Sequence, residues 1–167
     1  PIFFVWGFVG TFQLLRSIPA TRWGNLAMFG GRLALVSTCL AFYGLGARSF
    51  AWDVAFIETE MVATAKWTRA HLPQDALIAA HDIGALGYFD GRELVDLAGL
   101  VSPEVIPFIR DEEKLASYID QQHVDYLIVF PSWYETLSEG LPLVYNTEGT
   151  FAPMLGGENM NVYQWLR

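Results

Sequence analysis

The chain has 167 residues, of which 53% are hydrophobic and 17% are charged, and its net charge is −8 at pH 7. Soluble proteins carry about a quarter charged residues, so this composition is too apolar for an ordinary soluble domain. The 15% aromatic content excludes a disordered chain, and the single cysteine, Cys39, excludes a disulfide scaffold. Because phosphate binding needs a basic surface, the acidic balance indicates no nucleic acid partner.

The charges are distributed unevenly along the chain. All 18 acidic residues lie at or after Asp53, so residues 1–52 carry four arginines, no acid and a net charge of +4. Residues 53–167 carry the other six basic residues and have a net charge of −12. Such a division favours two regions in different solvents. We therefore predict transmembrane helices in residues 1–52, with the lipid bilayer as a partner, and a soluble domain in residues 53–167.

Two uncharged hydrophobic segments make up the predicted membrane region. The first, Ile2–Leu15, is expected to be the truncated end of a longer transmembrane helix. The second, Leu33–Ala47, extends to Trp52 if Arg48 snorkels to the interface, which gives about 20 residues, enough to cross a bilayer. Its small residues permit close packing against upstream transmembrane helices of the same protein. The alternative is that both segments are buried helices of a soluble protein, while their number disfavours a signal peptide.

The segment between the two hydrophobic stretches, Arg16–Arg32, holds three arginines and no acidic residue. Short basic loops stay on the cytoplasmic side of a membrane, so the second helix is expected to lead outward. This predicts a multi-pass protein of the cell membrane whose residues 53–167 are extracytoplasmic.

The soluble region alternates between helical and strand patterns. Residues 53–72 show the spacing of an amphipathic helix, which Pro73 ends. The predicted buried positions of this helix are Val54, Ile57, Met61, Ala65 and Leu72. The further predicted elements are a strand at 77–80, a short helix at 82–89, a strand at 94–97, a helical stretch capped by Ser102, a helix at 111–123, a strand at 126–130, and strands at 143–145 and 162–165.

Strands that alternate with helices predict an α/β fold. The expected architecture is N-terminal transmembrane helices followed by a small layered α/β domain with a mainly parallel sheet. The last two strands are candidates for an antiparallel addition to that sheet.

Residues 81–84 spell His-Asp-Ile-Gly, a string known from metal-dependent phosphohydrolases. A metal site needs three or more converging protein ligands, and the other histidines are only His71 and His123, so no metal is predicted. The favoured interpretation is that Asp82 caps a short helix after a strand. His81 and Asp82 are kept as ligand-binding candidates because α/β sheets place ligands at the carboxyl ends of their strands.

Three aromatic residues and one acid complete the candidate ligand-binding residues. Tyr88, Trp133 and Tyr134 could stack on a sugar, although ordinary packing is favoured for them. Asp96 could face a cleft or cap a turn, and the sequence leaves both interpretations open. The acidic run at 111–113 is expected to be the solvated start of a helix. The glycine-rich segments match no phosphate loop, so no cofactor is predicted in this fragment.

Three motifs at the start of the soluble region carry a resemblance to a known family. They are Pro-x-Asp-Ala-x-Ile-Ala at 73–79, Asp-Ile-Gly-Ala-x-Gly-Tyr-Phe at 82–89 and Val-Asp-Leu-Ala-Gly-Leu at 95–100, after a helix that contains Trp67. With residues 124–134 they resemble the C-terminal region of polytopic bacterial GT-C type glycosyltransferases, the dolichyl-phosphate-mannose–protein mannosyltransferase-like membrane proteins.

The resemblance implies transfer of a sugar from a polyprenyl-phosphate donor to a glycan or protein acceptor outside the cytoplasm. It places the catalytic carboxylates in an upstream loop that no position here matches, so no catalytic residue is assigned. This part would then be a lid and acceptor-side domain, and the full-length enzyme could use a divalent metal. The alternatives are a membrane-anchored extracytoplasmic binding or interaction module without enzymatic activity, and a hydrolase that uses His81 and Asp82.

Overall fold

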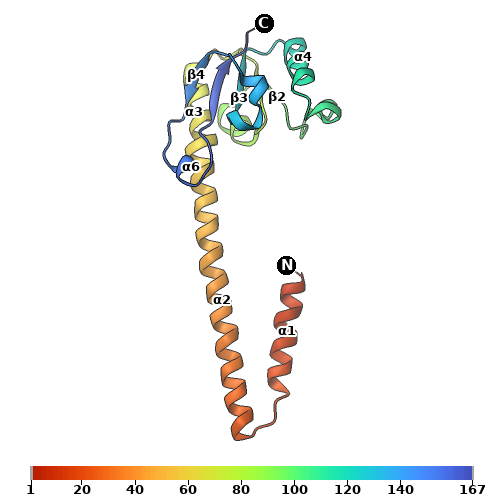
Figure 1. The fold of residues 1–167 in the computed structure, drawn as a ribbon, viewed down its shortest axis with the longest axis vertical. Helices are drawn as coiled ribbons and strands as arrows, with labels where there is room; N and C mark the ends of the chain where they lie inside the picture. The colour runs from red at the N-terminus through yellow and green to blue at the C-terminus, as the bar shows by residue number, and fades with distance from the viewer. Residues whose placement is uncertain (1, 167) are drawn as a thin grey trace. The chain divides into compact units, whose positions relative to one another are not determined.

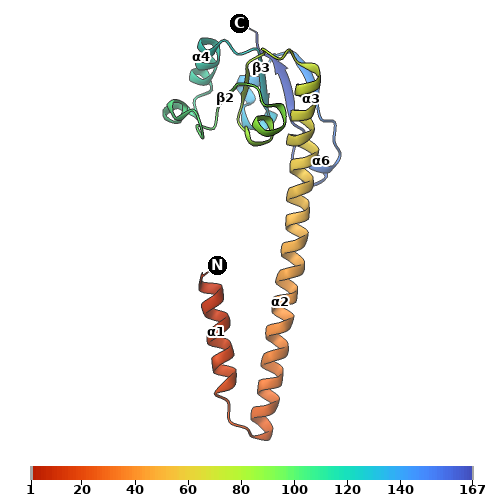
Figure 2. The same cartoon turned by 180° about the vertical axis from the view of Figure 1, so that it is seen from behind.

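The computed structural model describes residues 2–166, whose contacts divide the chain into two compact units, unit 1 (Pro1–Ala51) and unit 2 (Trp52–Arg167). Unit 1 contains α1 (Ile2–Arg16) and most of α2 (Arg22–Phe56), which run antiparallel (Figures 1 and 2). The side chain of Leu15 packs on the backbone of Gly31, where an added Cβ would lie 2.4 Å from its Cδ2 atom. This contact brings the two helices together beside their turn.

The basic loop predicted over residues 16–32 is mostly helix. The turn between the helices covers residues 17–21, and α2 begins at Arg22. Pro19 cannot continue an α-helix because it lacks a backbone N–H. After it, the Thr21 hydroxyl accepts a hydrogen bond from the N–H of Gly24 at 3.0 Å, as an N-terminal cap does. With no further proline before residue 73, the helix continues through the arginine-containing segment.

Apolar side chains cover the surface of α2. Within residues 2–166, one helix, Arg22–His71, is long and apolar enough to cross a membrane, and none of its most apolar stretch is buried. The large side chains that are more than half exposed on it include Trp23, Leu26, Phe29, Leu33 and Leu40. Such a surface favours lipid over water, so α2 is a candidate membrane-spanning helix. At 15 residues, α1 is shorter than the roughly 20 residues that a complete crossing needs.

Unit 2 is built on a five-stranded sheet. Its strands are β1 (Ile78–Ala80), β2 (Leu94–Asp96), β3 (Tyr126–Val129), β4 (Leu143–Asn146) and β5 (Asn161–Gln164), in the order β2-β1-β3-β5-β4. β1 is parallel to β2 and β3, whereas β5 is antiparallel to β3 and β4. The sheet is therefore mixed, and the predicted mainly parallel sheet is wrong, although the antiparallel addition of the last two strands is confirmed.

The antiparallel half of the sheet contains β4 and β5, and its connections carry only short helical segments. Between β3 and β5 the chain forms β4 and three helical segments of about one turn each, which are η4 (Pro131–Trp133), α5 (Glu135–Ser138) and α6 (Phe151–Met154). β4 lies at one edge of the sheet, where its register with β5 shifts between Leu143 and Tyr145.

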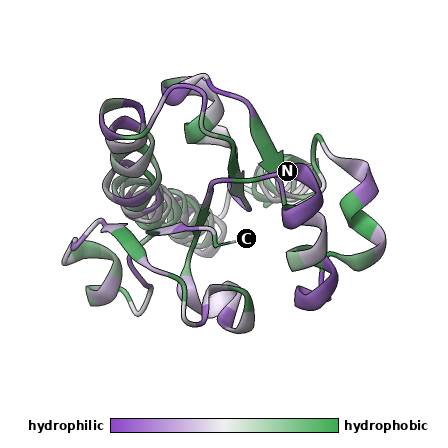
Figure 3. Ribbon diagram, turned by 90° about the horizontal axis from the view of Figure 1, so that it is seen from above, coloured by the Kyte–Doolittle hydropathy of each residue, from purple (hydrophilic) through white to green (hydrophobic). Residues whose placement is uncertain are grey.

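Helices cover both faces of the sheet, so unit 2 is a layered α/β domain. Figure 3 shows apolar green along much of its strands. On one face Ala79, Leu127 and Val129 pack with α4 (Glu112–Gln122), α5 and η3 (Pro103–Phe108). On the other face Ile78 and Ile128 pack with α3 (Ala63–His71) and η2 (Leu86–Asp90). Successive strand residues alternate between the two faces, as a β-strand requires.

The helix predicted over 53–72 forms and ends before Pro73, and its first two predicted apolar positions are exposed. Between α2 and α3 lies a π-helical segment, η1 (Ile57–Val62). Val54 and Ile57, which were predicted to be buried, are 41% and 45% exposed, whereas Glu60 and Thr64 are fully buried. Ala65 and Leu72 are buried as predicted, and Met61 packs against the core. The prediction is therefore wrong for the first two positions and confirmed for the later ones.

Two predicted helix starts have different outcomes. The side chain of Ser102 makes no capping hydrogen bond to η3, so the predicted serine cap is wrong. Asp111 caps α4, because its Oδ1 atom accepts a hydrogen bond from the N–H of Lys114 at 3.1 Å.

A buried carboxylate joins η1 to the loop between β4 and β5. Glu60 Oε2 accepts hydrogen bonds from the N–H of Met160, at 2.9 Å, and from the Thr147 hydroxyl, and Oε1 accepts one from Asn159 Nδ2 at 3.3 Å. A charge in the interior is costly unless its hydrogen bonds are satisfied. Because the three donors come from both ends of the loop, Glu60 ties both ends to the helix.

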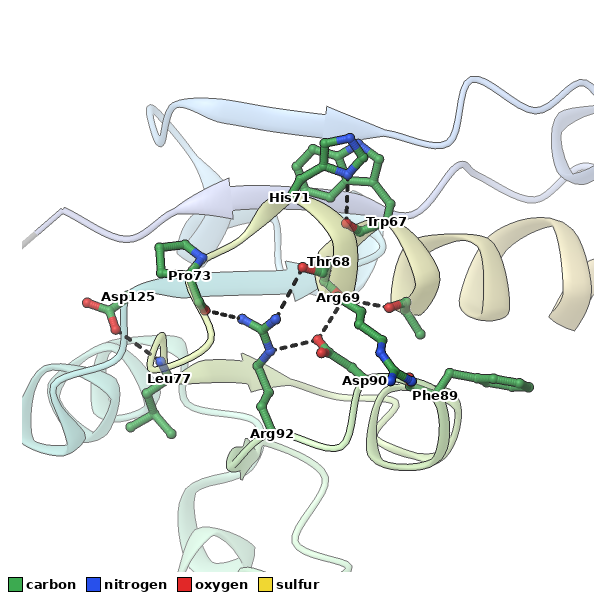
Figure 4. A network of polar contacts seen from close by, with 11 residues as sticks. Trp67, Thr68, Arg69, His71, Pro73, Leu77, Phe89, Asp90, Arg92 and Asp125 are labelled. Atoms are coloured by element: carbon green, nitrogen blue, oxygen red, sulfur yellow. Dashed lines mark hydrogen bonds and ion pairs between the residues drawn. The ribbon is translucent and has the colours of Figure 1, made fainter.

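A second buried network closes the C-terminal end of α3 (Figure 4). Arg92 Nε lies 2.8 Å from Asp90 Oδ2, and the two side chains are only 5% and 2% exposed. The same guanidinium donates to the carbonyl oxygens of Pro73 at 2.7 Å and Thr68 at 3.2 Å. The Thr68 hydroxyl donates to Asp90 at 2.8 Å. Arg92 thus adds a second hydrogen bond to two carbonyls at the end of the helix, which also accept from the N–H groups of Leu72 and Ala76, and joins α3 to η2.

Replacing this arginine tests the network. Arg92→Met would leave the Asp90 carboxylate buried without its cation, and we expect the free energy of unfolding to fall by about 3–5 kcal/mol. Urea unfolding of the full chain in detergent, followed by circular dichroism, measures the change.

The matched control is Lys114→Met, which breaks the exposed pair between Lys114 and Asp111. Surface pairs contribute little to stability, so this variant should unfold like the wild type. The double variant Asp90→Asn/Arg92→Met should regain part of the lost stability because it buries no unpaired charge. Equal losses in the Arg92 and Lys114 variants would contradict the role given to the buried pair.

Candidate functional site

The three parallel strands end at one edge of the sheet. In the register of the sheet Ala80, the last residue of β1, lies beside Asp96 of β2 and Ile128 of β3. The chain passes from β1 to β2 on one side and then to β3 on the other side. In open α/β sheets the connections diverge at such a point and leave a crevice at the carboxyl ends of the strands, where ligands bind.

An open pocket of about 520 Å³ lies among residues that follow these strands. His81 comes from the segment after β1, and Trp133 and Tyr134 come from the segment after β3. The other lining residues are Ile109, Arg110 and Glu112, at and before the start of α4. This volume is in the range of about 300–1,000 Å³ that small-molecule sites occupy.

An imidazole and a phenol form the polar centre of the pocket. The Tyr134 hydroxyl lies 2.6 Å from His81 Nδ1, within hydrogen-bond distance. The ring of Trp133 meets the His81 ring edge to face, with centroids 4.9 Å apart, and also packs on Phe130 at 5.0 Å. Tyr134 is 4% exposed and Trp133 is 49% exposed. Tyr134 is therefore a buried part of the pocket lining, while about half of the Trp133 side chain is exposed to solvent.

Burial keeps both polar rings uncharged near neutral pH. It lowers the pKa of His81, against the opposing effect of the Asp82 and Asp96 carboxylates. Burial also raises the pKa of Tyr134 to about 12, with smaller contributions from the negative charges of Glu112 and Asp96. The Tyr134 hydroxyl can then donate a hydrogen bond to His81 Nδ1, with the neutral imidazole carrying its proton on Nε2. In that tautomer Nε2 is a hydrogen-bond donor.

Asp96 is held by the backbone and does not line the pocket. It is fully buried at the end of β2, and its carboxylate accepts hydrogen bonds from the N–H groups of Ala98, at 2.8 Å, and Val101, at 2.7 Å. The turn that it closes needs Gly99, whose φ is +72° and where a Cβ would lie 2.7 Å from Ile106. The sequence left open whether Asp96 faces a cleft or caps a turn, and the structure shows that it caps a turn.

Asp82 and Tyr88 also lie outside the pocket lining. Asp82 Oδ1 accepts a hydrogen bond from the N–H of Gly84 at 3.2 Å, at the start of a helical turn. Tyr88 is 82% exposed and packs edge to face on Phe89. Within residues 2–166, His, Cys, Asp and Glu side chains form no group of three that could hold a metal ion.

Arg110 and Glu112 are pocket residues that sequence reasoning missed. Glu112 belongs to the run predicted to be solvated, yet it is half-buried and its Oε2 atom accepts a hydrogen bond from the N–H of Leu137 at 2.5 Å. No local signal distinguishes it from its exposed neighbour Glu113. The order of the strands brings the start of α4 to the segment after β3, and that order is a property of the whole fold.

The lowered pKa of His81 predicts a pH dependence of stability. The unfolded chain, in which the histidine has its ordinary pKa near 6.5, takes up a proton before the folded chain does as the pH falls. Stability is therefore lost on acidification through this range. His81→Asn should lose less stability than the wild type between about pH 7 and pH 5, as measured by urea unfolding.

Tyr134→Phe is the companion variant for this experiment. It keeps the imidazole and its apolar surroundings, so the pH dependence should persist. A pH dependence that is identical in the wild type and in His81→Asn would contradict the assignment.

Comparison with known proteins places the chain in a family without assigning it a site. A search among curated proteins gives no match. The family described as Domain of unknown function (DUF8728) matches residues 51–163, which is more than half of the chain and includes every residue that lines the pocket. The chain therefore belongs to the DUF8728 family.

Proposed function

We propose that this chain is the C-terminal part of an integral-membrane glycosyltransferase and that unit 2 binds a saccharide of the acceptor in its pocket. In this proposal a sugar moves from a polyprenyl-phosphate donor to an extracytoplasmic acceptor. The catalytic carboxylates belong to a loop outside this sequence, and unit 2 serves as the lid and acceptor-side domain.

The observation that carries the proposal is the half-exposed ring of Trp133 at the carboxyl edge of the sheet. A pyranose presents apolar C–H faces that stack on such a ring, and its hydroxyl groups need donors and acceptors around it. Arg110 supplies donors, Glu112 supplies an acceptor and His81 supplies a ring nitrogen, all from the same pocket lining. This combination of one free aromatic face with a few polar groups suits a neutral sugar.

Membrane placement is a further part of the proposal. The exposed apolar surface of α2 supports a crossing by this helix. We propose that α1 forms part of a second crossing, that the basic turn between the helices is cytoplasmic and that unit 2 is extracytoplasmic, because short basic segments are retained inside.

A membrane-anchored binding module without chemistry is the second candidate. The observation that favours it is the engagement of Glu112, the carboxylate among the lining residues, with the N–H of Leu137. A general base must be able to reach the proton that it removes, and this carboxylate already has a structural partner. Such a module would bind the same saccharide and transfer nothing.

Removal of the indole tests saccharide binding. In the full-length protein in membranes, Trp133→Ala should raise the KM for the acceptor by about 2- to 12-fold, which corresponds to the loss of about 0.5–1.5 kcal/mol from a ring contact. Transfer from a polyprenyl-phosphate sugar to an oligosaccharide acceptor, followed over a range of acceptor concentrations, gives the KM. Calorimetric titration with the same oligosaccharide measures binding alone.

The matched control is Tyr88→Ala, which removes an exposed ring outside the pocket lining. It should leave both KM and binding unchanged. Binding without transfer would favour the module over the enzyme. Unchanged binding and transfer in Trp133→Ala would contradict both proposals.

Cysteine labelling tests the orientation. In a Cys39→Ser background, Gln121→Cys on the exposed side of α4 should react with a membrane-impermeant maleimide in intact cells. Ala20→Cys, in the turn between α1 and α2, should react only after the membrane is permeabilised. The reverse pattern would place unit 2 in the cytoplasm.

A further inference from the structure

The loop between β4 and β5 presents an uncharged apolar tip. Nine residues, 149–157, read Gly-Thr-Phe-Ala-Pro-Met-Leu-Gly-Gly between Glu148 and Glu158. Within this stretch Met154 is 73% exposed and Leu155 is 42% exposed. Large adjacent apolar side chains on a loop without charges are unusual on a water-exposed surface and mark a contact site.

The tip is held in place against the helix. Glu60 on η1 binds donors on both sides of it, from Thr147 before the tip and from Asn159 and Met160 after it. These bonds hold both ends of the loop against η1. The exposed tip is thus presented from a fixed base.

The tip lies at the level where α2 ends. An added Cβ at Gly157 would be 3.2 Å from the ring of Phe56, the last residue of α2, so the loop packs against that ring. Figures 1 and 2 both show α6 beside the helix at this end of unit 2. Phe56 follows Trp52 by four residues, which is about 6 Å along a helix.

Exposed apolar residues also lie on the helix next to Phe56. Val54 and Ile57 are 41% and 45% exposed, after the uncharged stretch 49–52 of the candidate membrane-spanning helix. If α2 crosses a bilayer and its apolar stretch ends near Trp52, covalent continuity holds this part of unit 2 within a turn or two of the lipid surface.

We propose that the tip of the β4–β5 loop inserts into the interface of the bilayer that α2 crosses. Met154 and Leu155 are the side chains that enter the lipid. The occupant is lipid at the boundary between headgroups and acyl chains, where apolar side chains on a peripheral element are buried about 5–10 Å deep. The tip has no basic residue and is bordered by two glutamates. Apolar burial therefore drives the insertion, which does not require anionic lipid.

An environment-sensitive fluorophore on a single cysteine tests the insertion. The full chain with Cys39→Ser is reconstituted into phosphatidylcholine vesicles, and the fluorophore is attached at Leu155→Cys or, as a second variant, at Met154→Cys. We expect blue-shifted emission and loss of fluorescence when lipids carry a nitroxide near the top of the acyl chain. Gln121→Cys on α4 is the matched control and should show neither effect.

A fluorophore at Leu40→Cys, within the candidate span, reports whether α2 is in the bilayer. Quenching at residue 40 without any change at residues 154 and 155 would overturn the insertion and leave the span intact. Blue-shifted but unquenched emission at the tip would show that a protein surface covers it, which also overturns the proposal. The absence of quenching at residue 40 would remove the proposal together with the span.

Discussion

The backbone pairing of β1 with a parallel neighbour on each side is the constraint on which unit 2 depends. β1 has three residues, all fully buried, and two of them are alanines. Helices pack on both faces of this strand, and small side chains let them approach it. Because β2 and β3 lie on opposite sides of β1, the segments that follow the strands diverge. The pocket with His81 and Tyr134 is a consequence of that divergence.

Two buried charged groups hold the long helix to this sheet in different ways. The hydrogen bonds that Glu60 accepts within residues 2–166 come from neutral donors of the β4–β5 loop. Asp90 has the guanidinium of Arg92, which also binds two carbonyl oxygens near the end of α3. Each arrangement fills the hydrogen-bonding capacity of a group that would be costly to bury alone. The helix is therefore joined to the rest of unit 2 by polar contacts as well as by apolar packing.

Local signals in the sequence predicted the elements with clear chemistry. The apolar run of β3, the acidic first turn of α4 and the stop at Pro73 act through neighbouring residues and need no knowledge of the fold. The hydrophobic pattern also indicated α2, although the helical extent of the arginine-containing segment was missed. The parallel sheet was overestimated because strand direction depends on the path of the chain through the whole fold, which the pattern of a single strand does not encode.

The candidate site was predictable in part for the same reason. His81, Trp133 and Tyr134 follow strands, and residues after parallel strands meet at one edge, so their meeting in one pocket agrees with a general property of α/β sheets. Arg110 and Glu112 reach the pocket through the path of the chain between β2 and β3, which no local pattern encodes. Glu60 was overlooked because a glutamate in an amphipathic helix is expected to face solvent, whereas its partners here come from a loop about 90 to 100 residues further along the chain.

The outer margins of the sheet bear on how unit 2 behaves at high concentration. A long, regular margin strand is a template for joining copies of a protein into fibrils. β4 carries the exposed apolar residues Leu143 and Val144, yet it follows a proline and its ladder with β5 is irregular at these positions. β2, at the opposite margin, has only three residues. Both margins are thus poor templates, which guards the domain against amyloid-like growth.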